Sequence, residues 1–296
     1  MIKVLLDTDI GGDIDDAICL AYLLREPRCR LLGITTVCGE SEKRAAVADA
    51  ICRAAGRIVP IIAGMDTTLQ PIPVYPTPDG ACALERWPHS TYEKGDAPAF
   101  LYQKIKENPH EVELIGIGNM TNIAVLFRDY PDAPGLLKGL HVMNGYFGIR
   151  PLPEPWYNWN SWADPLASKE VFSASIVVHR VIPLEVTDML TIKAEKVGRL
   201  LKTDSRLMQA VFDFGSAWLE SSGELTLHDP LAAVCLFHPD ICRFDRGCVR
   251  VEIKAKETMG ATAFISAREG NVEVARWADA GRFYGILSAV LNNAEA

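Results

Sequence analysis

The sequence lacks the patterns that mark several large classes of protein. Its eight cysteines include no CxxC pair, so neither a disulfide framework nor a thiolate zinc site is expected. No apolar run approaches the length of a membrane span. Lysine and arginine number 30 against 38 aspartates and glutamates, and no basic stripe is present. This balance argues against a nucleic-acid partner.

The remaining composition is typical of an enzyme. The chain has 296 residues, of which 49% are hydrophobic, and this is sufficient for one large core. We find no internal repeat or linker and therefore predict a single domain over residues 1–296. Only three apolar residues separate Lys3 from Asp7, which does not suit a secretory signal. We therefore expect a cytoplasmic protein.

An acidic turn near the start of the chain is the most informative feature of the sequence. Val4 to Leu6 predict a short buried strand, and residues 17–24 predict an apolar helix. Five aspartates lie between or beside them, namely Asp7, Asp9, Asp13, Asp15 and Asp16. So many like charges on one turn favour a bound cation, and hard oxygen ligands suit Ca²⁺ or Mg²⁺. A solvated loop that caps a helix is the alternative, but it explains only one or two of the five.

Strand and helix patterns alternate along the chain. Further strands are expected at residues 30–37, 59–63, 112–117, 140–143, 176–182, 249–253, 262–266 and 272–277. Helices are expected at 41–55, 97–107, 121–128, from about 165, and at 194–201, 207–221, 230–237 and 281–291. Residues 65–95 and 144–162 are expected to form long loops. This order predicts an open, doubly wound, Rossmann-like α/β fold, with a mostly parallel sheet and helices on both faces. A site is expected at the carboxyl ends of the strands.

Three short polar strings follow predicted strands or begin predicted helices. They are GIGNMTNIA (116–124), NWNSWADP (158–165) and LHDP (227–230). Each has a structural explanation of its own: Thr121 as a helix cap, Asn158 and Asn160 as turn residues, and Asp229 as a cap for the helix that Pro230 begins. Their convergence on the edge that carries the acidic turn favours a functional site.

Five motifs in order resemble the inosine-uridine-preferring nucleoside hydrolase family over nearly the whole chain. They are DTDIGGDIDDA, GITTVCGE, GNMTNIA, the Asn160 to Pro165 motif NxxxDP, and HDP at residues 228–230. The resemblance implies hydrolysis of the N-glycosidic bond of ribonucleosides to ribose and free base. It also implies one bound Ca²⁺, no organic cofactor, a role in nucleoside catabolism and salvage, and assembly as a homodimer or homotetramer.

The resemblance implies a role for individual residues. Asp9, Asp16, Asp229 and the main-chain carbonyl of Thr121 correspond to calcium ligands. Asp9 also corresponds to the base that takes a proton from the attacking water.

Other positions correspond to contacts with substrate. Asp15 and Asn160 would hold the sugar, Asp229 would lie near the ribose diol, and His228 would assist departure of the base. Trp156, Trp159 and Trp162 are further candidates, for stacking on the base.

Three residues depart from the family pattern. Asp13 is an extra carboxylate in a turn two residues longer than the common form. Glu40 stands where an asparagine is usual, and Asn158 stands where a glutamate contacts the ribose 5′ end. Together these changes suggest a rearranged sugar pocket, with Glu40 and Asn158 at its border.

Parts of the sequence also fit other classes of function. A phosphatase would use Asp7 and Asp9 as a nucleophile and acid pair. A calcium-binding module without catalysis is suggested by the D-x-D-x-G string, although the twelfth position of such a loop is Ile18 rather than a bidentate glutamate. A relative without activity is disfavoured by the intact Asp9, His228 and Asp229.

Overall fold

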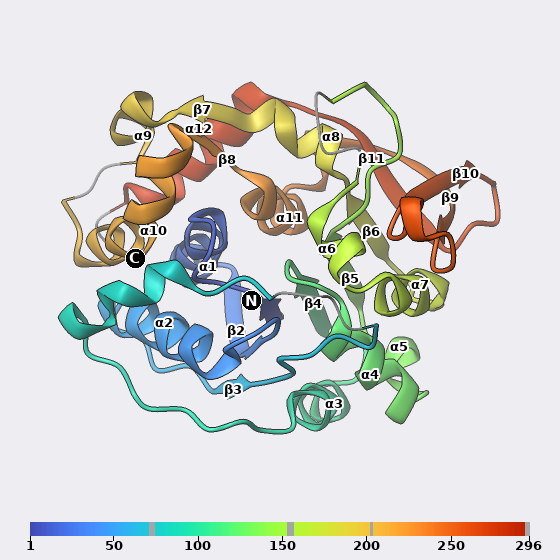
Figure 1. Ribbon diagram of the computed structural model, residues 1–296, viewed down its shortest axis with the longest axis horizontal. Coiled ribbons are helices and arrows are strands. Elements are labelled where there is room, and N and C mark those ends of the chain that lie inside the picture. Colours follow the sequence, from blue (N-terminus) through green and yellow to red (C-terminus); the bar gives the residue numbers. More distant parts are fainter. Residues whose placement is uncertain (71–74, 153–156, 202–203, 294–296) are drawn as a thin grey trace.

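A nine-stranded sheet lies at the centre of the molecule (Figure 1). The computed structural model describes residues 1–70, 75–152, 157–201 and 204–293. The strand order is β10-β9-β11-β6-β5-β4-β1-β2-β3. The strands are β1 (Ile2–Thr8), β2 (Cys29–Thr36), β3 (Ile61–Ala63), β4 (Val112–Gly116), β5 (Gly139–Met143), β6 (His179–Ile182), β9 (Cys242–Val251), β10 (Thr262–Ser266) and β11 (Val272–Ala278). All neighbouring pairs from β3 to β11 are parallel, whereas β9 and β10 form an antiparallel edge.

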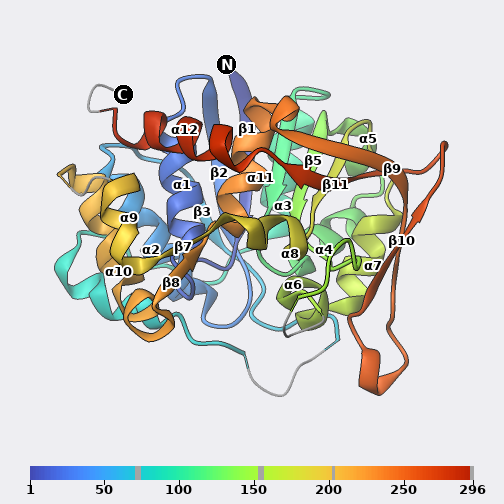
Figure 2. The same ribbon diagram turned by 90° about the horizontal axis from the view of Figure 1, so that it is seen from above.

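Helices cover both faces of the sheet (Figures 1 and 2). One layer contains α1 (Asp15–Arg25), α2 (Ser41–Ala54), α10 (Arg206–Ser222), α11 (His228–Phe237) and α12 (Ala280–Leu291). The other contains α3 (Ala97–Glu107), α4 (Thr121–Asp129), α5 (Ala133–Leu136) and α7 (Pro165–Ser173). The expected doubly wound α/β fold is therefore confirmed.

Alternation along β1 shows why this strand is buried on both sides. Val4 and Leu6 pack with the apolar side chains of the α1 layer, and Leu5 packs with those of the α4 layer. A central strand of a covered parallel sheet needs apolar residues on both faces. The short VLL run meets this requirement.

The strand order places the acidic turn at a point where ligands commonly bind. The first six strands lie in the order 3-2-1-4-5-6, so the chain reverses direction across the sheet between β1 and β4. The connection after β1 leads to α1 on one face, and that after β4 leads to α4 on the other. In such sheets ligands bind in the crevice where the order reverses.

Some predicted boundaries are wrong. The expected loops 65–95 and 144–162 contain a 3₁₀ helix, η1 (Asp79–Arg86), and the short α6 (Trp159–Ala163). Strand β9 begins at Cys242 rather than residue 249, because the exposed side chains of Arg243 and Asp245 interrupt the apolar pattern of its first half.

The helix expected at 194–201 is present as α9 (Ala194–Leu200). Three short elements near it were not predicted. They are α8 (Leu184–Thr187), β7 (Thr191–Lys193) and β8 (Glu224–Thr226), and β7 pairs with β8 as a small antiparallel sheet. None is long enough to show a periodic pattern. Within the described ranges, no helix has the length and apolarity that crossing a membrane requires.

Candidate functional site

The acidic turn joins the end of β1 to the start of α1. The Thr8 hydroxyl donates to Oδ1 of Asp16 and accepts the backbone N–H of Ile10 at 3.1 Å. Asp15 and Asp16 occupy the first turn of α1, where the helix dipole favours negative charge. The end of the strand and the beginning of the helix are thus tied together through a carboxylate.

Three buried carboxylates meet at this turn. Asp15, Asp16 and Asp229 each present an oxygen atom, and these atoms all lie within 4.8 Å of one another. The three residues are only 3%, 5% and 4% exposed. The backbone N–H of Asp229 donates to Oδ2 of Asp15 at 3.0 Å, so the start of α11 is fixed against the start of α1.

The chemistry of this cluster fits a divalent cation. Burial, followed by the neighbouring carboxylates, raises the pKa of Asp15 and Asp229 well above the ordinary value, and the same causes act on Asp16. No lysine or arginine in the described ranges forms an ion pair with any of the three. Close, dry, hard oxygen donors of this kind can hold a metal ion. The predicted ligands Asp16 and Asp229 are brought together, and Asp15 joins them.

Asp9 and Asp13 border the cluster and are less enclosed than its members. Both side chains are half-buried. Burial raises the pKa of Asp9, and the nearby Arg44 guanidinium opposes this rise. Burial and then Asp16 raise the pKa of Asp13 to about 7, while its Oδ1 accepts the N–H of Ile14 at 2.6 Å.

Asp7 lies beneath the turn and is fully buried. Its Oδ1 accepts hydrogen bonds from the Thr35 hydroxyl at 2.5 Å and from Nδ2 of Asn122 at 2.7 Å. Burial raises its pKa to about 7. These contacts join β1, β2 and α4, so Asp7 braces the sheet edge and does not present a nucleophile to solvent. A phosphatase that uses Asp7 as its nucleophile is therefore disfavoured.

The segment that follows β4 runs beside the acidic turn. A Cβ atom added to Gly118 would lie 2.9 Å from the backbone nitrogen of Asp9, so these two backbones are in close contact. The Thr121 hydroxyl lies within hydrogen-bond distance of Oδ1 of Asn119, at 2.9 Å, and of Oδ2 of Asp164, at 2.7 Å. Its side chain is therefore engaged away from the cluster. This leaves the predicted ligand role to its main-chain carbonyl.

Asn158 and Asn160 are both buried, and their side-chain amides make different hydrogen bonds. Nδ2 of Asn160 donates to the carbonyl oxygens of Ile117 and Met143, at 2.7 and 2.9 Å. Only its Oδ1 then remains to accept a hydrogen bond. Oδ1 of Asn158 accepts the N–H of Ser161 at 3.3 Å and caps α6, whereas the structural role that its position suggested was that of a turn residue.

The remaining candidates are only partly buried or are exposed. Glu40 adopts a left-handed conformation (φ 49°) before α2 and pairs with Lys43. Its predicted place at the sugar stays a prediction. The rings of Trp159 and Trp162 are 5.2 Å apart, and Trp159 is 39% exposed. Trp156 lies outside the described residues.

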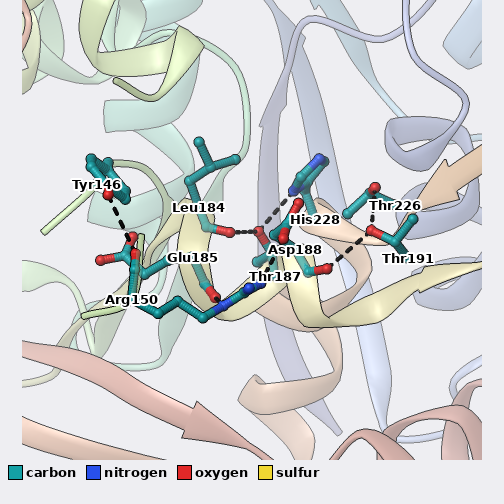
Figure 3. A network of polar contacts seen from close by, with 9 residues as sticks. All are labelled: Tyr146, Arg150, Leu184, Glu185, Thr187, Asp188, Thr191, Thr226 and His228. Carbon is teal, nitrogen blue, oxygen red and sulfur yellow. Dashed lines mark hydrogen bonds and ion pairs between the residues drawn. The ribbon is translucent and has the colours of Figure 1, made fainter. Parts of the chain in front are cut away.

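His228 begins α11 beside Asp229 and is half-buried. Its Nδ1 lies 2.7 Å from the Thr187 hydroxyl, which also donates to the Leu184 carbonyl oxygen at 2.9 Å (Figure 3). Removal of the ring from water lowers the pKa of His228 to about 4, although the charge of Asp188 opposes this. Arg150 braces the same segment by donating to the Glu185 carbonyl oxygen and to the Asp188 carboxylate, at 2.7 and 2.6 Å.

Comparison with known proteins identifies the family. Residues 4–285 match the family described as inosine-uridine preferring nucleoside hydrolase. The chain belongs to this family. It is therefore a nucleoside hydrolase, an enzyme that cleaves the N-glycosidic bond of ribonucleosides, and the resemblance seen in the motifs is confirmed.

Named relatives and solved structures agree with this assignment. The chain is 29% identical to the probable uridine nucleosidase 1 of Oryza sativa subsp. japonica, over 84% of this chain and 81% of that one. It is 28% identical to the non-specific ribonucleoside hydrolase RihC of Escherichia fergusonii, over 99% of each chain. The structure of the plant nucleoside hydrolase PpNRh1 superposes with a TM-score of 0.85 at 22% identity over 98% of each chain, which supports the fold.

Sequence reasoning missed several residues that organise the site of this nucleoside hydrolase. Asp164 caps α7 and also accepts the backbone N–H of Leu69 at 2.7 Å, which ties a distant loop to the edge. Arg44 holds the backbone of the acidic turn, and Thr187 contacts the ring of His228. A cap aspartate before Pro165 was visible in the sequence. In contrast, the contacts of Arg44 with the acidic turn and with Pro76, and that of Thr187 with His228, join segments far apart in the chain. No local pattern reveals such contacts.

Proposed function

We propose that this nucleoside hydrolase holds one Ca²⁺ at the acidic cluster and uses Asp9 to activate the attacking water. The meeting of the Asp15, Asp16 and Asp229 carboxylates within 4.8 Å supports this assignment most directly. The ligands would be Asp9, Asp16, Asp229 and the Thr121 carbonyl. A bound cation supplies charge neutralisation, a grip on hydroxyl oxygens and a lowered pKa of water.

Asp9 is suited to take the proton because it is near the cluster and still accessible. Its side chain is half-buried, whereas Asp7 in the same turn is fully enclosed. The water oxygen forms a bond to C1′ of the sugar while the bond from C1′ to the base nitrogen breaks. The proton of the attacking water passes to Asp9. A second water, held beside His228, supplies the proton that the departing base takes up on its own nitrogen. The surrounding carboxylates stabilise the positive charge that develops on the sugar.

Other side chains would orient the substrate. Asp15 and Oδ1 of Asn160 are suited to accept hydrogen bonds from sugar hydroxyls, since Nδ2 of Asn160 is already used by two carbonyl groups. His228, next to Asp229 at the start of α11, would lie beside the base. Trp159 offers an exposed ring for stacking.

We extend the proposal to the setting of the reaction. The family resemblance supports a cytoplasmic enzyme of nucleoside catabolism and salvage that acts as a homodimer or homotetramer. Light scattering of the purified protein tests the assembly, and a mass of one chain would contradict it.

Ribose release from a panel of purine and pyrimidine nucleosides tests the proposed reaction. The panel should include 2′-deoxyribosides and 5′-modified ribosides, with the free base identified by chromatography. We expect release to fall after treatment with a chelator and to return when Ca²⁺ is added. Turnover that a chelator leaves unchanged would contradict the metal assignment. Failure to cleave any member, with Ca²⁺ present, would contradict the proposed catalytic residues.

A further inference from the structure

Arg44 is one of the largest fully buried side chains of the described chain, with an exposure of 1%. It lies in the first turns of α2. Its Nε donates to the carbonyl oxygens of Cys38 and Gly39, at 2.7 and 2.9 Å. Its Nη1 donates to those of Asp9 and of Ile10, the latter at 3.1 Å. Its guanidinium thus grips the acidic turn and the turn after β2 together.

A third segment joins the same side chain. Nη2 of Arg44 donates to the carbonyl oxygen of Pro76 at 2.8 Å. The guanidinium therefore also binds the segment of residues 75–80. In the sequence this segment is more than thirty residues from Arg44 and more than sixty from the acidic turn.

The three segments are packed so closely that glycine is required between them. Gly11, with φ 109°, would place a Cβ atom 2.8 Å from Cβ of Pro78. Gly39, with φ 59°, would place one 2.8 Å from Cβ of Tyr75. The backbone N–H of Gly80 also donates to the Gly11 carbonyl oxygen at 2.9 Å. Residues 75–80 thus cover both turns, and Arg44 lies at the point where all three meet.

The guanidinium makes no ion pair with any carboxylate in the described residues, and all five of its hydrogen-bond partners there are carbonyl groups. A buried charge without an ion pair is expensive. Its neighbours explain why it is tolerated, because it is bonded to the backbone of Asp9 and acts electrostatically on Asp9 and Asp16. It supplies a fixed positive charge beside a turn that carries five aspartates.

We propose that Arg44 is a positioning residue that holds the acidic turn in its metal-binding form before any cation arrives. By clamping the turn to two other segments, it fixes the backbone from which the Asp9 carboxylate projects. The proposal rests on the function proposed above for Asp9 and the acidic cluster. Arginine is needed because its planar fork reaches carbonyl groups on several sides, whereas a lysine ammonium is one compact donor.

Arg44→Lys tests the clamp, and Arg53→Lys is the matched control. Arg53 lies on the same helix but pairs at the surface with Asp49, at 2.9 Å, and with Ser90. Ca²⁺ affinity is measured by calorimetry on chelator-treated protein, and kcat and KM are measured at saturating Ca²⁺. We expect Arg44→Lys to weaken Ca²⁺ binding by about tenfold or more, as loss of a group supporting metal ligands does. We expect kcat to fall by about a hundredfold from misplacement of the base. Arg53→Lys should change neither.

A purely structural role would give a different result. In that case Arg44→Lys would lower the unfolding temperature equally with and without Ca²⁺, and Ca²⁺ affinity and kcat at lower temperature would equal those of the parent. That outcome would overturn the proposal.

Hydrogen exchange of the parent enzyme keeps the test decisive if the variant does not fold. The amides of residues 9–14 and 38–40 should be protected in chelator-treated protein and gain little when Ca²⁺ is added. Free exchange that becomes slow only with Ca²⁺ would show that the turn is not preformed. This measurement needs no nucleoside turnover, so its failure is distinguishable from failure of the proposed function.

Discussion

The Thr187 hydroxyl fixes the proton of His228. It donates to the Leu184 carbonyl oxygen at 2.9 Å, so at the 2.7 Å contact it must accept from Nδ1–H of His228 (Figure 3). The neutral ring then carries its proton on Nδ1 and leaves Nε2 as a bare acceptor. Because α8 carries Thr187, and Arg150 braces the segment just after it, the orientation of the ring is set by parts of the chain that follow β5 and β6.

Thr187→Val should remove this control while preserving the shape of the side chain. The ring loses its acceptor at Nδ1 and populates both tautomers and further orientations. We expect kcat on a natural nucleoside to fall by roughly tenfold to a hundredfold, which is the usual range when the partner of a functional imidazole is lost. Thr187→Ser, which keeps the hydroxyl, should recover most of the rate. Equal rates for the valine and serine variants would show that the hydroxyl has no such role.

The fold could be predicted from the sequence because its signals are local. The VLL run of β1, the apolar strands that follow and the amphipathic helices each carry their own pattern, and alternation then requires a parallel sheet. The order of the strands in the sheet could not be predicted from local patterns. It depends on which strands pair, and that pairing put the acidic turn at the reversal between β1 and β4.

The site could be predicted only in part, for the same physical reason. Asp15 and Asp16 stand in one turn and were visible as a pair, and Asp229 was found through the HDP motif. Arg44 resembles any charged residue of an amphipathic helix, and its five carbonyl partners lie in three separated segments. Contacts of that kind are determined by tertiary packing, and the hydrophobic periodicity of the sequence does not reveal them.

Asp9→Asn should separate catalysis from metal binding. The amide keeps an oxygen that can act as a ligand but cannot accept the proton of water. We expect turnover to fall by roughly two to four orders of magnitude, the usual contribution of a general base. The Ca²⁺ content of the protein should change much less. Turnover within about twofold of the parent would mean that another carboxylate takes the proton. Asp13→Asn would then identify it.

His179 should make the enzyme sensitive to mild acid. The residue is 1% exposed on β6, and no side chain among the described residues forms a hydrogen bond with either ring nitrogen. Burial lowers its pKa to about 4, from 6.5. Between pH 6.5 and about 4, His179 binds a proton in the unfolded chain but not in the folded chain. Stability from this residue is therefore present above pH 6.5 and is lost as the pH falls toward 4, by up to about 3 kcal/mol.

His179→Leu should abolish this part of the acid dependence. The free energy of unfolding is measured with urea at several pH values between 7 and 4. The variant should be at least as stable as the parent near pH 4.5, and the difference between them should shrink toward pH 7. His89→Leu, which alters an exposed imidazole, serves as the control. Parallel curves for His179→Leu and the parent would rule out His179 as the source.

His228→Ala should reveal how the base departs. A purine can leave after it is protonated at a ring nitrogen, whereas a pyrimidine needs its leaving charge stabilised. With its proton on Nδ1, the ring can accept a hydrogen bond at Nε2 from a water, and the other hydrogen of that water can serve the departing base. Thr187 fixes the ring in this orientation. We therefore expect His228→Ala to slow release of a natural base by roughly two orders of magnitude or more.

A substrate with an activated leaving group provides the comparison. The p-nitrophenyl riboside releases p-nitrophenolate, which needs no proton to depart. Its hydrolysis should be slowed far less by His228→Ala than that of inosine or uridine, while Asp9→Asn should slow all three alike because water activation is common to them. If His228→Ala slows the activated and the natural substrates to the same extent, the imidazole does not assist the leaving group. Its place beside Asp229 would then serve only to shape the start of α11.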